Sequence, residues 1–263
     1  MLKDLSICFV QSNLVWENVD ANLQYLDGLL KTISKPIDLI VLPEMFSTGF
    51  SMNPSKFANE QHNIACIQQM KKWAVAFQSV VCGSIMFAED GNFYNRFLWI
   101  SPDGSNQHYD KAHLFRMGEE NKHYTRGNKQ FLVELKNWKL ACFVCYDLRF
   151  PVWLRRTKEF NYDAMLFVAN WPARRNLHWQ TLTRARAIEN QSYVIAVNRI
   201  GMDGNQIEHI GNSAVFEPNG NYIVDAASDE GLFYAELSAQ DLIQYRTQFP
   251  VEMDADSFQL NFK

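Results

Sequence analysis

The stretch Trp138-Lys-Leu-Ala-Cys-Phe-Val-Cys-Tyr-Asp-Leu-Arg-Phe-Pro151 brings a run of apolar residues to an abrupt change of chemistry at Cys145. The residues before Cys145 predict a buried strand, and the turn after it leads to Pro151, which suits the first position of a helix. A thiol at such a junction lies near helix N-terminal N–H groups, which favour a thiolate and can bind an oxyanion. Cys145 is therefore a candidate nucleophile, and a buried, chemically silent cysteine is the alternative.

The composition is that of an ordinary globular protein, with 47% hydrophobic and 21% charged residues in a chain of 263. The net charge of −4 and the lack of a long Lys/Arg run argue against nucleic-acid binding. No apolar stretch approaches the roughly 18 residues of a membrane span, and the start shows no signal-peptide core. No linker divides the chain, so we expect one domain over residues 1–263, located in the cytoplasm.

Five cysteines lie in apolar contexts, which does not suit the disulfide framework of a small secreted domain, so reduced thiols are expected. Cys142 and Cys145 form a C-x-x-C, a spacing found in redox and zinc sites. Residues three apart on a strand point to opposite faces. The sequence also holds no second C-x-x-C or C-x-x-H to complete a zinc site. We therefore predict neither a metal nor a redox role.

The pattern of apolar residues predicts strands and helices in two similar halves. Strands are expected at residues 5–11, 38–42, 80–87, 93–100, 139–145, 163–168, 193–197, 213–216, 222–225 and 232–236. Helices are expected at residues 18–32, 61–77, 151–160, 176–190 and 238–249. An aspartate, an apolar strand and a proline-containing loop follow one another after Asp38 and again after Asp163. This repeat suggests two β-α-β halves that face each other.

Glu44 follows directly on the strand expected at 38–42. Beside Phe46 and Phe50 it would be partly desolvated, which favours the protonated carboxylic acid and suits proton transfer near neutral pH. A glutamate that caps the loop or faces solvent is the alternative.

Other polar side chains stand near strand ends. Lys111 could polarise a carbonyl oxygen, although most lysines lie on the surface. Glu120 belongs to a polar loop that could equally be a solvated charge cluster. Asn170, Arg174 and Arg175 follow the strand expected at 163–168. Spread over the sequence, these groups can converge only if the strands lie side by side.

Three motifs, in this order, resemble those of the nitrilase superfamily of carbon–nitrogen hydrolases. They are Leu42-Pro-Glu44, Tyr109-Asp-Lys-Ala-His-Leu-Phe115 and Cys145-Tyr-Asp-Leu-Arg-Phe-Pro151, with support from Arg184-Ala-Arg-Ala-Ile-Glu-Asn190 and Gly211-Asn-Ser213. The resemblance covers essentially the whole chain. The segments around Glu44 and Asn170 look most like those of bacterial omega-amidases.

The resemblance implies an α/β fold, a four-layer α-β-β-α sandwich, in a homodimer that needs no cofactor. Cys145 would attack an amide carbon, Glu44 would act as general base, and Lys111 with the Tyr146 N–H would stabilise the oxyanion. Glu120 matches a second family glutamate that orients Lys111 and the substrate amide. An omega-amidase would hydrolyse the terminal amide of a dicarboxylate monoamide, such as 2-oxoglutaramate or 2-oxosuccinamate.

Such a substrate carries a carboxylate, which needs a cation when it lies beside a thiolate and two glutamates. Arg174 and Arg175 are the candidates, because the planar guanidinium can hold a carboxylate bidentately. Which of the two binds is left open, and both could instead be solvated. The side chains expected to enclose the short carbon chain are Phe46, Phe50, Tyr146 and Trp171.

Three other functions stay open at this point. A papain-like protease would need a histidine base, and His113, His123 and His178 stand in no recognisable partner motif. A catalytically inactive scaffold would tolerate the loss of Glu44 or Lys111, yet both are retained. A broader aliphatic amidase or an N-carbamoyl amide hydrolase of the same superfamily is the alternative that the sequence does not separate.

The C-terminal tail, about residues 250–263, follows the expected last helix, which Pro250 ends. It carries Phe258, Leu260 and Phe262 in alternation. This pattern favours docking on a partner surface over free solvation, so we expect the tail to contact the second subunit of a homodimer.

Overall fold

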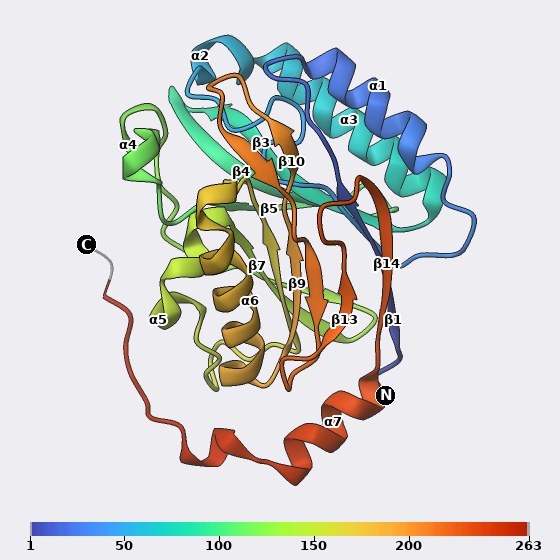
Figure 1. Cartoon of the computed structure of the whole chain (residues 1–263), viewed down its shortest axis with the longest axis vertical. Coiled ribbons are helices and arrows are strands. Elements are labelled where there is room, and N and C mark those ends of the chain that lie inside the picture. Colours follow the sequence, from blue (N-terminus) through green and yellow to red (C-terminus); the bar gives the residue numbers. More distant parts are fainter. Residues whose placement is uncertain (1, 262–263) are drawn as a thin grey trace.

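The computed structural model describes residues 2–261 as four layers, in which two central β-sheets carry helices on their outer faces (Figure 1). Sheet one has the strand order β14-β1-β2-β3-β4-β5, and sheet two has the order β13-β12-β9-β8-β7-β6. This arrangement confirms the α-β-β-α sandwich.

Ten strands of the two sheets agree closely with the predicted ranges, whereas β5 and β6 are not among those ranges. The strands of sheet one are β1 (Leu5–Gln11), β2 (Leu39–Val41), β3 (Val80–Glu89), β4 (Asn92–Ile100), β5 (Asn106–Asp110) and β14 (Gly231–Leu237). Those of sheet two are β6 (Leu132–Leu135), β7 (Trp138–Val144), β8 (Ala164–Val168), β9 (Tyr193–Val197), β12 (Ala214–Phe216) and β13 (Tyr222–Asp225). A separate hairpin, absent from the prediction, pairs β10 (Ile200–Met202) with β11 (Glu208–Ile210).

The α-helices are α1 (Val19–Leu30), α2 (Pro54–Phe57), α3 (Glu60–Phe77), α4 (Glu120–His123), α5 (Pro151–Leu154), α6 (Asn176–Asn190) and α7 (Ala239–Gln248). Asn18 and Asn59 cap α1 and α3, because each side chain accepts a hydrogen bond from a backbone N–H of the first turn. In Figure 1, α1 and α3 cover the outer face of sheet one, and α6 lies over sheet two.

The two halves of the chain repeat one plan, as the sequence suggested. In sheet one β1, β2 and β3 are parallel neighbours, and in sheet two β7, β8 and β9 are. Antiparallel strands flank each parallel set. The carboxyl ends of the parallel strands therefore come together at one edge of the sandwich.

The sheets are held face to face by a fully buried apolar core. Sheet one contributes Phe9 and Trp99 to it, and sheet two contributes Leu140 and Leu166. A second buried cluster, which includes Met70, lies between sheet one and helices α1 and α3. Since both faces of sheet one are covered, its central strands are apolar on both faces, as the sequence shows.

The helix predicted over residues 151–160 is wrong in its extent, because α5 ends at Leu154. Arg155 adopts an extended backbone there. Its guanidinium donates to the Glu189 carbonyl at 2.6 Å, and the Arg156 N–H donates to the Asn190 side chain at 2.9 Å. These contacts with the end of α6 outweigh the weak helical preference of the segment.

The tail follows α7 as a short turn, Val251–Asp254, and then runs extended along the outside of the molecule (Figure 1). Leu260 packs at the edge of the core of its own chain, and Phe258 is 39% exposed. Phe262 lies outside the described residues, so docking of the tail on a partner stays a prediction. Within residues 2–261, no helix combines the length and apolarity that crossing a membrane requires.

Candidate active site

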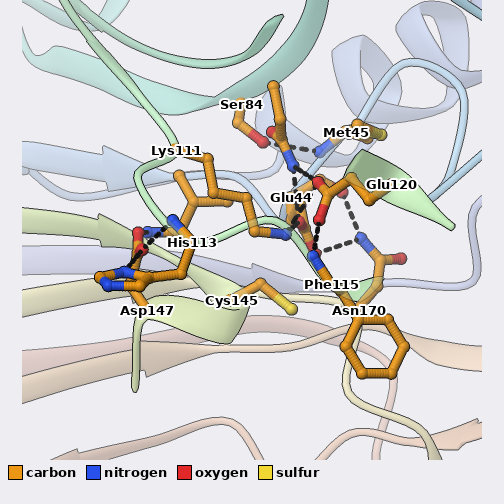
Figure 2. A network of polar contacts seen from close by, with 12 residues as sticks. Glu44, Met45, Ser84, Lys111, His113, Phe115, Glu120, Cys145, Asp147 and Asn170 are labelled. Carbon is orange, nitrogen blue, oxygen red and sulfur yellow. Dashed lines mark hydrogen bonds and ion pairs between the residues drawn. The ribbon is translucent and has the colours of Figure 1, made fainter. Parts of the chain in front are cut away.

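Glu44, Lys111, Glu120 and Cys145 meet at the edge where the two sheets face each other (Figure 2). Glu44 follows β2, Lys111 follows β5, Glu120 begins α4 and Cys145 follows β7. The structure thus brings together the four residues that the sequence singled out for catalysis.

Lys111 lies between the two carboxylates. Its Nζ is 3.0 Å from Oε1 of Glu44 and 3.0 Å from Oε1 of Glu120. All three side chains have no exposed surface. Burial alone would lower the pKa of Lys111, but Glu120 and Glu44 hold it well above its usual value. The side chain is therefore an ammonium, available to stabilise negative charge.

Glu120 is held by donors on both oxygens. Oε1 faces Lys111, and Oε2 accepts the Phe115 N–H at 2.6 Å. Burial, reinforced by the negative charge of Glu44, raises the pKa of Glu120 despite the attraction of Lys111.

The loop that carries Glu44 is fixed against β3. The Leu42 N–H donates to the Cys82 carbonyl at 2.8 Å, and the Met45 N–H donates to the Ser84 hydroxyl at 3.0 Å. Gly83 is required between these contacts, because a Cβ there would lie 2.8 Å from Cβ of Leu42. The backbone that presents the carboxylate is therefore held from two directions.

The backbone of Lys111 is held as closely. Its carbonyl accepts the Gly127 N–H at 2.9 Å. A side chain at position 127 does not fit, since a Cβ would come within 2.0 Å of the Asp110 carbonyl oxygen. The glycine thus lets two backbone segments meet next to the lysine.

Cys145 opens a short 3-10 turn, Cys145–Arg149, with φ at +48°. Such a left-handed backbone is unusual for a residue with a side chain and is often found at functional sites. The sequence predicted that nearby N–H groups would favour a thiolate. The structure corrects this, because burial, and then the negative charge of Glu44, raise the pKa of the Cys145 thiol well above its usual value. The resting state is therefore a thiol, which lies close to the Glu44 carboxylate (Figure 2).

Asp147 ties the turn of Cys145 to the segment that carries Lys111. One of its oxygens accepts the Val144 N–H at 3.0 Å and the Tyr109 hydroxyl at 2.8 Å. The other accepts the His113 N–H at 3.0 Å and lies 2.7 Å from Nδ1 of that ring (Figure 2). The His113 ring also stacks on Phe150, with 3.8 Å between the ring centroids, so its side chain is held on two sides.

Two buried asparagines complete the surroundings of Glu44. Asn170, which was predicted, donates its amide to the Glu44 carbonyl at 2.8 Å and to Oε2 at 3.2 Å. Asn95, which was not predicted, donates to Oε1 of Glu44 at 2.7 Å and to Oε1 of Glu120 at 3.2 Å. The sequence offers one indication of Asn95: it is a polar residue in β4, a strand that is otherwise largely apolar.

A pocket of about 140 Å³ opens above Cys145 and Asn170. Its apolar wall contains Phe50, Phe115 and Trp171. Tyr146 also lines it, as predicted. Phe46 does not: its ring is fully buried in the core between sheet one and the helices, so the prediction that it encloses a substrate is wrong.

Cations line the mouth of this pocket. Arg174 and Arg175 are both present, and Arg149, which the sequence analysis did not select, lies beside them. Nη1 of Arg175 is buried and has no hydrogen-bond partner among the described residues. Burial, and then the charges of Arg174 and Arg149, lower the pKa of Arg175. An anion placed among the three guanidinium groups would relieve this repulsion.

Known proteins match both the sequence and the structure. The sequence model of the carbon–nitrogen hydrolases matches residues 6–247. The chain is 44% identical to omega-amidase YafV of Escherichia coli (strain K12), over 97% of this chain and 98% of the relative. It is 29% identical to 2-oxoglutaramate amidase of Bacillus subtilis (strain 168), over 94% and 95% of the two chains.

Among solved structures, XC1258 of Xanthomonas campestris superposes with a TM-score of 0.95 at 39% identity, over 99% of this chain and 100% of that one. That protein is described as a member of the CN-hydrolase superfamily with an arsenic adduct in its active site.

We predict that Glu44→Gln slows alkylation of Cys145 by iodoacetamide at pH 7 at least about tenfold, because the thiol loses its general base. The rate is measured by mass spectrometry of the peptide that contains Cys145. Glu119→Gln is the control, since Glu119 is exposed and pairs with Lys122. Faster alkylation in Glu44→Gln would mean that Glu44 acts on the thiol only as a negative charge.

Proposed function

The chain belongs to the carbon–nitrogen hydrolase family, and from this membership we propose that it is an omega-amidase that releases ammonia from short dicarboxylate monoamides. It is a hydrolase of amide carbon–nitrogen bonds. The observation that carries the proposal is the apposition of Cys145 and Glu44 beneath a pocket whose mouth holds unpaired arginine charge.

The first half-reaction joins the substrate to the enzyme. Cys145 transfers its proton to Glu44 and attacks the amide carbon, while the Lys111 ammonium and the Tyr146 N–H stabilise the oxyanion. Glu120 holds Lys111 in place. Glu44 then gives the proton to the departing nitrogen, so ammonia leaves and a thioester remains.

The second half-reaction restores the enzyme. Glu44 removes a proton from a water molecule, which attacks the thioester carbon. The tetrahedral intermediate collapses, the carboxylic acid leaves and the proton returns to the sulfur of Cys145.

Three arginines of the pocket could bind the carboxylate at the end of the substrate opposite its amide. An amide carbon above Cys145 would place a carboxylate a few carbons away at the mouth of the pocket, near Arg175. Its buried, unpaired Nη1 makes Arg175 the first choice, and Arg174 and Arg149 can share the charge. The names of the relatives, an omega-amidase and a 2-oxoglutaramate amidase, agree with this choice. The broader aliphatic amidase and the N-carbamoyl hydrolase are not favoured.

We predict that Cys145→Ala folds normally and loses amidase activity, because a small apolar residue fits the site but cannot attack. Cys142→Ala should keep most of its activity, since Cys142 faces the core between the sheets, although it loses a little stability. Ammonia release and thermal unfolding are measured for both. More than a few per cent of residual turnover in Cys145→Ala would contradict the role of the thiol.

We predict that wild-type protein releases ammonia faster from 2-oxoglutaramate and 2-oxosuccinamate than from a neutral aliphatic amide of similar length. Arg175→Met should lower kcat/KM for the keto-acid amides at least about tenfold, or about 1.4 kcal/mol, and change the neutral amide little. Arg184→Met is the matched control, because Arg184 stacks on Tyr222 away from the pocket. Equal losses on both substrates would rule out a carboxylate contact and favour a general aliphatic amidase.

We also propose that the protein is a cytoplasmic homodimer. All five cysteines are free thiols, which suits a reducing compartment. Val152 of α5 and Leu177 and Ile188 of α6 expose apolar side chains on neighbouring elements, and such a face suits a subunit interface. The tail from residue 250 onward would add to it.

We expect that a chain truncated after Pro250 keeps its fold but dimerises more weakly, because it loses the apolar side chains of the tail. Sedimentation velocity over a range of concentrations measures this. A full-length chain that is monomeric at every concentration would contradict the dimer, and an unchanged dimer after truncation would contradict docking of the tail on the partner.

A further inference from the structure

Asn95 is a polar residue with no exposed surface in strand β4. Buried amides normally satisfy both their donors and their acceptor. Asn95 satisfies only the donors: its Nδ2 contacts both catalytic carboxylates, whereas Oδ1 is buried with no partner among the described residues. The orphan oxygen costs stability, so the orientation is set by the two glutamates.

The backbone of Asn95 also holds the catalytic lysine. Its carbonyl accepts the Lys111 N–H at 3.0 Å. The next residue along, Arg96, forms a bidentate pair with Asp110 at 2.7 and 2.9 Å across the β4–β5 register. Because Arg96 is nearly fully buried, this pair fixes the strands against each other. Asn95 is therefore held rigidly next to Lys111, Glu44 and Glu120.

The donors on Glu44 are unequal. Oε1 accepts hydrogen bonds from the Lys111 ammonium at 3.0 Å and from the Asn95 amide at 2.7 Å. These two donors together occupy both lone pairs of Oε1. Among residues 2–261, only the Asn170 amide donates to Oε2, at 3.2 Å. One lone pair on Oε2 is thus left for a proton.

We infer that Asn95 is a positioning residue, which holds Oε1 of Glu44 against Lys111 and so reserves Oε2 as the atom that takes the proton of Cys145. In the transfer the S–H bond breaks and an O–H bond forms on Oε2, while Asn95 keeps its contact with Oε1. The inference rests on the proposed amidase chemistry, in which Glu44 is the base.

A donor that binds the ionised carboxylate favours ionisation. Without Asn95, the ionised carboxylate of Glu44 loses one of the donors that stabilise it. The acidic limb of the pH profile must then move to higher pH. A residue that only filled space would leave the limb in place.

The test compares Asn95→Leu, which has a similar volume and no donor, with Asn95→Asp, which has the same shape and a third negative charge. Asn92→Ala is the control, because Asn92 is an exposed asparagine of the same strand. For each protein, kcat and KM for 2-oxoglutaramate and the rate of Cys145 alkylation by iodoacetamide are measured against pH.

We expect the acidic limb of Asn95→Leu to move up by about one pH unit in both assays. The kcat should fall at least about tenfold, with KM within about threefold of wild type. Asn95→Asp should move the limb further, and Asn92→Ala should match wild type. An unmoved limb, or a higher KM with unchanged kcat, overturns the inference.

The two assays separate this inference from the function. A wild-type protein that releases no ammonia overturns the omega-amidase proposal, and the alkylation profiles still decide the role of Asn95. If Asn95→Leu does not fold, Asn95→Asp decides. Failure of both to fold would make Asn95 a structural residue and overturn the inference.

Discussion

The structure depends on one dry ionic contact, in which the Lys111 ammonium lies between the carboxylates of Glu44 and Glu120. Moving charges out of water costs several kcal/mol per ion, and attraction between them repays this only where hydrogen bonds satisfy the remaining atoms. Here those bonds to the carboxylate oxygens come from the Asn95 and Asn170 amides and the Phe115 N–H. The closely fitted loops around the site keep water away from an arrangement that would be weak on the surface.

Much of this could be predicted from the sequence, because local patterns encode it. Apolar runs bounded by turns predicted ten of the strands, and three short motifs indicated Glu44, Lys111 and Cys145. The strands β5, β6, β10 and β11 were not predicted. The helix after Pro151 was predicted too long, because contacts of Arg155 and Arg156 with the end of α6 end it, and no local pattern contains those contacts.

The residues that sequence reasoning missed act through distant partners. Asn95 contacts a glutamate 51 positions away, and Arg149 matters only because its turn faces the loop of Arg174. Phe46 shows the opposite error: proximity to Glu44 in sequence suggested the pocket, but its ring points into the core. The spacing of residues along a chain predicts well which residues are functional. It predicts less well the direction in which each side chain points.

The division of the site between the two halves of the chain also bears on how the protein matures. Glu44, Asn95, Lys111 and Glu120 all precede Cys145 and Asn170 in the chain and lie in the first half of the fold. A ribosome-bound chain makes the base and its partners first, and domains fold as units during synthesis. Strand β14, which follows all of sheet two in the chain, pairs with β1 in sheet one, so the sheet that carries the base is complete only when the last strand has been made. The active site can thus assemble only in the complete chain, and a partly synthesised chain cannot hydrolyse amides.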